Sequence, residues 1–158
     1  MFPTSFAVTH YLAAPGGKPT PRQVIDWFEH SLQANYAEVV RQEPSVLDFT
    51  VPPGVWFESG ELAWVRTGTI DASEGSQVVT VEADIEVTRL PGLVGLGAPV
   101  LGAMFPFAMI GTVVGGLVFG CYLVIGPYRA SRLKFSAYFE ATCGDIRASY
   151  GRGHLTSA

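Results

Sequence analysis

The chain has 158 residues, of which 48% are hydrophobic and 15% charged, and its mean hydropathy is +0.28. This length suits one domain, and the composition excludes a disordered chain, a collagen-like fibre and, with only two cysteines, a disulfide framework. Residues 1–89 carry a net charge of −7 and residues 129–158 a net charge of +3, so the larger part would repel phosphates and we expect no nucleic-acid partner.

The first predicted element is a strand over residues 5–12, where Phe6, Val8, His10 and Leu12 alternate with more polar residues. A Pro/Gly loop over residues 13–19 follows. Thr20, Pro21 and Gln23 then form a helix start, with a capping threonine, a proline in the first turn and a glutamine that completes a capping box. This amphipathic helix is expected to run to about Gln42, before Pro44. Its apolar stripe comprises Val24, Ile25, Phe28, Leu32, Tyr36, Val39 and Val40.

Three strands are predicted next, over residues 45–51, 61–70 and 77–90, with a turn at 71–76. The last of these alternates so regularly that it indicates a sheet with one wet face. A further strand is predicted over residues 133–143, where Leu133, Phe135, Ala137 and Phe139 alternate with polar residues. Because a lone strand cannot bury its face, we expect it to rejoin the sheet built by residues 1–90.

Residues 90–128 contain no Asp, Glu, Lys, Arg or His, and these 39 residues exceed the roughly 20 that one membrane span requires. We therefore expect a transmembrane helical hairpin with arms at 92–104 and 108–126, turning near Phe105, Pro106 and Phe107. The alternative is a single span over residues 104–126, with the acidic part outside the membrane. The predicted fold class is thus α+β, a small mixed sheet with one amphipathic helix, interrupted by a transmembrane hairpin before the last strand.

The corresponding domain organisation is a soluble α+β domain at 1–90, a transmembrane hairpin at 91–127, and at 128–158 a returning strand with a polar tail. No signal peptide is evident at the N-terminus, so insertion through the internal segment is expected. The basic residues that follow the apolar run favour a cytoplasmic C-terminus, and the less favoured alternative is that they only solvate a strand edge. The expected interface anchors are Phe105, Phe107, Tyr128, Arg129, Arg132 and Lys134.

Small residues recur at a spacing of four in the apolar run, which allows helices to approach closely. They could serve packing within the hairpin or docking against helices of another subunit, and both interpretations stay open. The predicted helix-packing and partner-contact residues are Ala98, Gly102, Gly111, Gly115, Gly116 and Gly120.

The apolar run lacks ionisable groups, which argues against a channel, a proton relay or a voltage sensor, and it has no histidine to ligate haem. No cofactor is expected, although a lipid, carotenoid or quinone could contact the glycines. Outside the run, Asp26 and His30 lie four residues apart on the predicted helix, with Glu29 beside His30. We expect a surface ion pair there rather than a metal or acid–base site, because no third ligand is nearby.

Trp27 and Trp64 are expected in the core, while Trp56 and Phe57 follow a Pro-Pro-Gly turn and could contact a partner or pack in the core. Two further residues, Cys121 and Cys143, are interpreted as unpaired, buried thiols.

Together these patterns predict a non-catalytic integral membrane accessory subunit that stabilises a larger complex, with respiratory and photosynthetic complexes as general precedents. The alternative is a membrane-tethered sensor or ligand-binding module that uses the concave face of its sheet. The expected partners are membrane lipid and other integral membrane subunits. The expected location is the inner (cytoplasmic) membrane, with the soluble domain and the C-terminus in the cytoplasm.

Overall fold

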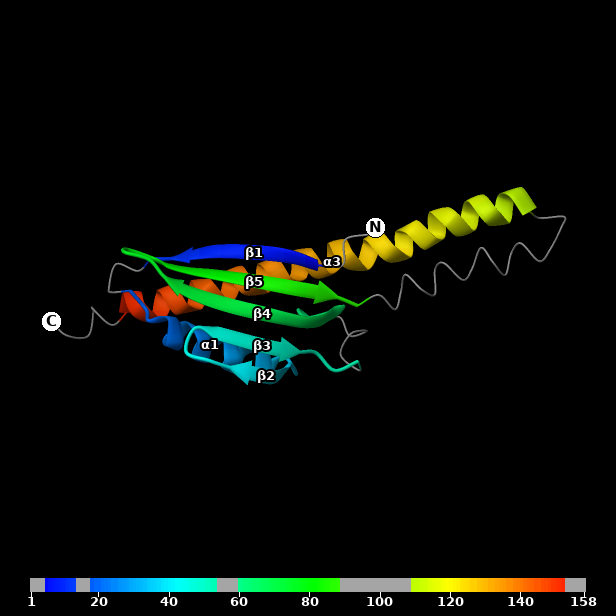
Figure 1. Ribbon diagram of the computed structural model, residues 1–158. Coiled ribbons are helices and arrows are strands. Elements are labelled where there is room, and N and C mark those ends of the chain that lie inside the picture. The colour runs from blue at the N-terminus through cyan, green and yellow to red at the C-terminus, as the bar shows by residue number, and fades with distance from the viewer. Residues whose placement is uncertain (1–4, 14–17, 54–59, 89–108, 153–158) are drawn as a thin grey trace.

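A computed structural model of the chain describes residues 5–13, 18–53, 60–88 and 109–152, with side chains of the last segment described over residues 125–150. Figure 1 shows a sheet with helices on one of its faces. The elements are β1 (Ser5–Leu12), α1 (Pro21–Ala34), β2 (Glu38–Gln42), β3 (Val46–Thr50), β4 (Val65–Glu74), β5 (Val79–Val87) and α3 (Met109–Arg152).

The five strands form one sheet in the order β1-β5-β4-β3-β2, and every neighbouring pair is antiparallel. The predicted mixed sheet is therefore wrong. Strands β2 to β5 follow one another along the chain and pair as successive hairpins, whereas β1 pairs with β5 at the far edge (Figure 1). Alternate residues of β5 are buried under the helices, as the period of two in its sequence indicates.

Strand β1 has the predicted bounds, and β3 lies within the predicted range. The β4–β5 turn lies later than expected: β4 continues to Glu74, and the amide of Gly75 donates to the carbonyl of Val78 at 2.9 Å. Lys18, which precedes α1 in the chain, contacts this turn. Its ammonium group donates to the carbonyl of Gly75 at 2.7 Å and pairs with Glu74 at the same distance.

The capping box at the start of α1 is confirmed, since Thr20 and Gln23 exchange the two expected hydrogen bonds. The helix ends at Ala34, eight residues before the predicted end, and the following residues form β2. Tyr36 takes a left-handed conformation with φ of 63°, and the amide of Ala37 donates back to the carbonyl of Leu32. This is a Schellman ending with tyrosine where glycine is usual, which explains why no residue there marks the helix end in the sequence.

The predicted strand over residues 133–143 is wrong, because these residues belong to α3. Their apolar side chains satisfy both a period of two and the three-to-four spacing of a helix, and packing selects the helix. The ring of Phe139 stacks on Phe28 of α1 at 5.1 Å, and the hydroxyl of Tyr138 donates to Ser31 of α1 at 2.9 Å. The buried residues of this helix face are Ser131, Phe135, Tyr138, Phe139, Thr142, Cys143 and Ile146.

The predicted transmembrane hairpin is contradicted. Among the described residues, no helix combines the length and apolar character that crossing a bilayer requires. The segment predicted as the second arm does not end at residue 126. It is instead the beginning of α3, which continues through Pro127 onto the sheet. The first arm and the turn at Phe105 and Phe107 lie outside the described residues.

This finding also overturns the predicted integral membrane location, its cytoplasmic topology and the role of membrane accessory subunit. The missing charge in residues 90–128 led to these predictions, but a lack of charge is also compatible with apolar contacts inside a protein assembly.

Candidate functional site

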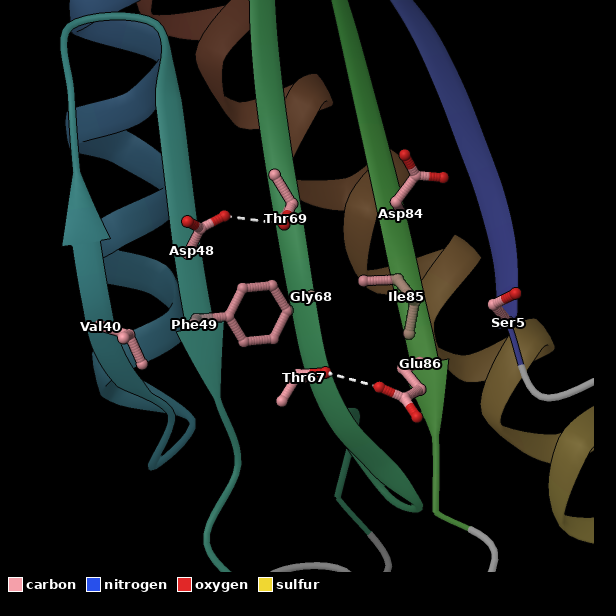
Figure 2. Close-up of a pocket in the computed structure, with 10 residues that line it drawn as sticks. All are labelled: Ser5, Val40, Asp48, Phe49, Thr67, Gly68, Thr69, Asp84, Ile85 and Glu86. Atoms are coloured by element: carbon pink, nitrogen blue, oxygen red, sulfur yellow. Dashed lines mark hydrogen bonds between the residues drawn. The ribbon is translucent and has the colours of Figure 1, made fainter.

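Two regions of the described structure merit comparison as sites, and the first is a hollow of about 420 Å³ on the sheet face opposite the helices. Figure 2 shows that its polar side chains come from β3, β4, β5 and, with Ser5, β1, which present them in neighbouring cross-strand positions. The lining residues are Ser5, Val40, Asp48, Phe49, Thr67, Gly68, Thr69, Asp84, Ile85 and Glu86.

The polar groups of this hollow bond mainly to one another. Thr69 donates to Asp48 at 2.7 Å and Thr67 donates to Glu86 at 3.3 Å, as the dashed lines in Figure 2 indicate. Arg41 and Arg66 lie 3.7 Å from the carboxylates of Asp48 and Glu86, respectively. The hollow is open to water, and most of its polar side chains are already paired, as a solvated sheet surface requires. It therefore gives no reason to assign a ligand.

The second region is the end of the sheet at which β1 and β4 begin and β5 ends. Ser5 lies opposite Glu86, and Val65 lies opposite Val87. Helix α3 covers this end and projects beyond it (Figure 1). The backbone here is closed by a hydrogen bond of 2.9 Å from the amide of Thr88 to the carbonyl of Trp64.

Three aromatic rings meet here between β1 and α3. The ring of Phe6 contacts Tyr128 and Phe135 edge-on, with both centroid separations at 6.0 Å. Tyr128 and Phe135 are seven residues apart, which is about two helical turns, so Phe6 spans the turn between them. Ser131 belongs to that turn and lies on the same helix face. We call Phe6, Tyr128, Ser131 and Phe135 the aromatic end.

Ser131 is the unusual member of the aromatic end. Its residue surface is 0% exposed, and its hydroxyl has no hydrogen-bond partner among the residues that the structure describes. Most buried polar side-chain atoms in proteins are paired, and an unpaired one costs about 1–3 kcal/mol. The hydroxyl of Ser131 therefore keeps its capacity to form a hydrogen bond while lying on a helix face between aromatic residues.

Trp64 adds backbone strain at the same end of the sheet. Its φ of 68° lies in the left-handed region, which is uncommon for a bulky residue, and its partly buried side chain packs against the core. A strained backbone conformation persists only where the surrounding structure holds it in place, and such residues are often found at binding sites. Because Trp64 lies at the same end of the sheet, its strain favours the aromatic end over the hollow as the candidate binding site.

The polar groups deeper along α3 are satisfied. Besides its bond to Ser31, Tyr138 accepts through its backbone carbonyl a bond of 3.0 Å from the hydroxyl of Thr142. Burial raises the pKa of Tyr138 to about 12, and burial likewise raises the pKa of the Cys143 thiol to about 12. Cys143 is a free thiol, as the sequence indicates, but its proton is held too tightly for a nucleophile at neutral pH.

The acid–base candidates of the sequence do not converge. Asp26 and Glu29 accept hydrogen bonds from Gln42 at 3.4 and 2.8 Å, and the predicted ion pair between Asp26 and His30 is not formed. Elsewhere, His10 contacts Arg147, which also donates to the carbonyl of Tyr11 at the opposite end of β1. The residues that the structure describes include no group of three potential metal ligands.

Of the predicted contact residues, Tyr128 becomes part of the aromatic end, while Arg129 and Arg132 point from α3 into solvent and Lys134 is half-buried. The glycines 111, 115, 116 and 120 lie in the first part of α3, and their packing stays a prediction. Trp27 is 40% exposed, so its core assignment is wrong. The other predicted residues lie outside the described part of the chain. They are Trp56, Phe57, Ala98, Gly102, Phe105 and Phe107.

Sequence reasoning missed Ser131. Its signal is a single hydroxyl at a helix-spaced position among apolar residues, three residues after Tyr128 and four before Phe135. In a strand, Ser131 would share a face with Leu133 and Phe135 at the start of the strand. The strand interpretation therefore did not place it next to Tyr128 and Phe135 in a buried setting.

The comparisons with known proteins identify no family. No family description matches the chain, and no curated protein matches it. Among solved structures, CalU16 from Micromonospora echinospora is 15% identical over 87% of each chain, with a TM-score of 0.35. The di-domain ARO/CYC BexL from the BE-7585A biosynthetic pathway is 14% identical over 85% of this chain and 50% of that chain, with a TM-score of 0.26. Scores this low also occur between unrelated folds, so neither similarity assigns a fold family or a function.

Proposed function

We propose that this protein binds a small, predominantly apolar ligand at the aromatic end, between β1 and α3. The observation that carries the proposal is the buried, unpaired hydroxyl of Ser131. Small-molecule sites typically combine an apolar, aromatic lining with a few polar groups that fix the ligand's orientation. A ligand that offers one hydrogen bond to Ser131 would remove the cost of the unpaired hydroxyl, so bound ligand and folded protein would stabilise each other.

The aromatic end also has features that would allow a ligand to reach Ser131. Tyr128 and Trp64 are only partly buried, so solvent reaches this end of the sheet. The side chain of Tyr128 is held by a hydrogen bond of 3.4 Å to the carbonyl of Ser5, which is a long and weak contact. Pro127 precedes it within α3 and removes one backbone hydrogen bond from the helix. A small rearrangement of the Tyr128 turn would therefore expose the hydroxyl of Ser131 at modest cost.

This proposal concerns binding, and two expectations from the sequence stay predictions beside it. The first is that the protein catalyses no reaction, which agrees with the raised pKa of the buried Cys143 thiol. The second is that it binds no nucleic acid, which agrees with the net charge of −7 on residues 1–89.

Calorimetric titration with 2-acetylnaphthalene, an apolar two-ring ketone, tests the proposal. We expect saturable binding to one site and a rise in Tm with ligand concentration, corresponding to about 2.7 kcal/mol at one hundred times Kd. Ser131→Leu replaces the hydroxyl with a larger apolar side chain and is expected to weaken binding at least tenfold. The matched control is Thr69→Leu on the opposite sheet face, where binding should be unchanged.

Circular dichroism establishes whether each variant is folded, and Ser131→Val replaces Ser131→Leu if the larger side chain prevents folding. The wild-type titration decides the matter independently of any variant. Absence of heat and of a Tm change up to the solubility limit of the ketone would overturn the proposal, as would equal weakening by the Thr69 control.

A further inference from the structure

We propose that the group on the ligand that meets Ser131 is electrically neutral, a hydroxyl or a carbonyl, so that the site selects neutral oxygenated molecules over carboxylates and amines. This inference rests on the proposed function and specifies its ligand class. It starts from the burial of Ser131, whose surface is 0% exposed. Any ligand group that forms a hydrogen bond with this hydroxyl must therefore lose its own hydration.

Among the described residues, the aromatic side chains next to Ser131 offer no counter-charge to a buried ion. Phe6, Tyr128 and Phe135 flank it on β1 and on its own helix face, and the charged residue Lys134 lies three residues further along that face. An ionised group brought among these rings would lose its hydration without gaining a counter-charge from them, a cost that exceeds what one hydrogen bond returns.

Basic residues nearby face elsewhere or are occupied. Arg129 and Arg132 are exposed, and their positions two residues before and one after Ser131 place them on other faces of α3. Lys134 lies one turn after Ser131, is half-buried and already takes part in an interaction. Its long side chain can keep the ammonium group near water.

The hydroxyl itself defines the acceptable partner. A serine hydroxyl can donate one hydrogen bond and accept others, so it satisfies a carbonyl as donor and an alcohol in either role. Both groups cost far less to bury than an ion once they are hydrogen-bonded. One such bond contributes enough to separate a ketone from the corresponding hydrocarbon by about three- to tenfold in affinity.

Three probes of nearly equal size test the inference: naphthalene, 2-acetylnaphthalene and 2-naphthoate, titrated at pH 7 against the wild type, Ser131→Ala and Lys134→Gln. For the wild type we expect the ketone to bind about three to ten times more tightly than naphthalene, and the carboxylate at least tenfold more weakly than the ketone. In Ser131→Ala, the difference between ketone and naphthalene should shrink to within about twofold while naphthalene itself still binds. Lys134→Gln should leave the ketone unaffected.

The possible failures are separable. If none of the three probes binds, the proposed function itself fails. If all three bind with equal affinity, or if Ser131→Ala preserves the preference for the ketone, binding stands and the inference is overturned. It is overturned equally if 2-naphthoate binds most tightly and loses its advantage in Lys134→Gln, because Lys134 would then select an anionic ligand.

Discussion

At the scale of single residues, Ser131 combines complete burial with an unpaired hydroxyl, which gives a stability prediction for the free protein. Ser131→Ala removes a polar atom that gains nothing from its surroundings, so the variant without ligand should be more stable by about 1 kcal/mol. Urea denaturation followed by circular dichroism measures the difference. A loss of stability of similar size would show that the hydroxyl is satisfied in solution and would remove the main support for the site.

Gly68 of β4 tests how tightly the sheet packs beneath the helices. A β-carbon at this position would lie 2.6 Å from the Phe49 ring and 2.6 Å from Ile85 Cδ1, closer than side chains tolerate. Gly68→Ala should therefore lower the free energy of unfolding by about 1–3 kcal/mol. Gly144 on the exposed side of α3 is the matched control, because a β-carbon there meets nothing within 4 Å and Gly144→Ala should stabilise by up to about 1 kcal/mol. Equal effects at both positions would contradict the packing.

The two buried groups with raised pKa values predict how stability depends on alkaline pH. Tyr138 shifts from 10.0 and Cys143 from 9.0, each to about 12, so above pH 9 the unfolded chain has released protons that the folded chain retains. Their contribution to stability is complete below pH 9 and is lost as the pH rises from 9 to 12, by at most about 1.4 kcal/mol per pH unit for each group. Urea denaturation at pH 8, 9, 10 and 11 measures the slope.

The double variant Tyr138→Phe with Cys143→Ala provides the comparison for this pH series. It lacks both titrations, so its stability should decline less steeply between pH 9 and 11. If the wild type and the double variant lose stability in parallel, the decline originates from other groups.

At the scale of elements, the sequence predicted the start of α1 but not its end, and the difference lies in the cap residues. Thr20, Pro21 and Gln23 are the residue types that a helix start requires, and the capping box forms as expected. The end depends on Tyr36 in a left-handed conformation that glycine normally provides, so no residue there marks a stop. Tertiary packing of β2 against β3 supplies the missing information.

This ending of α1 can be tested directly. Tyr36→Gly removes the strain of a β-carbon in the left-handed region and should raise the free energy of unfolding by about 0.5–1 kcal/mol. Tyr36 is 71% exposed, so the change removes little packing. Tyr36→Ala is the control, because it keeps the β-carbon and should bring no gain. Thermal or urea denaturation of both variants would contradict the assignment if alanine stabilised as much as glycine.

The last predicted strand shows the complementary limit of sequence patterns. Residues 133–143 alternate in hydropathy well enough for a strand, yet the rings of Phe135 and Phe139 stack on one another at 6.0 Å along one face of α3. A spacing of four fits both a strand and a helix, and only the partner surface decides between them. That surface is provided by Phe6 and Phe28, which lie more than a hundred residues earlier in the chain.

At the scale of the whole molecule, β1, β3, β4, β5 and the start of α1 followed from local patterns, whereas β2 was predicted as helix and the membrane interpretation of residues 90–128 is contradicted. The run without charge was correctly recognised as unusual, but its environment was inferred from composition alone. The site was equally out of reach for sequence reasoning, because the aromatic end joins the start of β1 to the middle of α3. Ser131 becomes informative only when Phe6 is known to contact Tyr128 and Phe135, which precede and follow it on the helix face.

The central claim is that an apolar ligand binds at the aromatic end, and nuclear magnetic resonance of isotopically labelled protein titrated with 2-acetylnaphthalene tests it most directly. We predict that the largest shift changes fall on Phe6, the amide of Thr88, the indole of Trp64 and the segment from Tyr128 to Phe135, with magnetisation transfer from the ligand to these side chains. Shift changes centred on Thr69 and Asp84 of the opposite sheet face, or none up to the solubility limit, would contradict the claim.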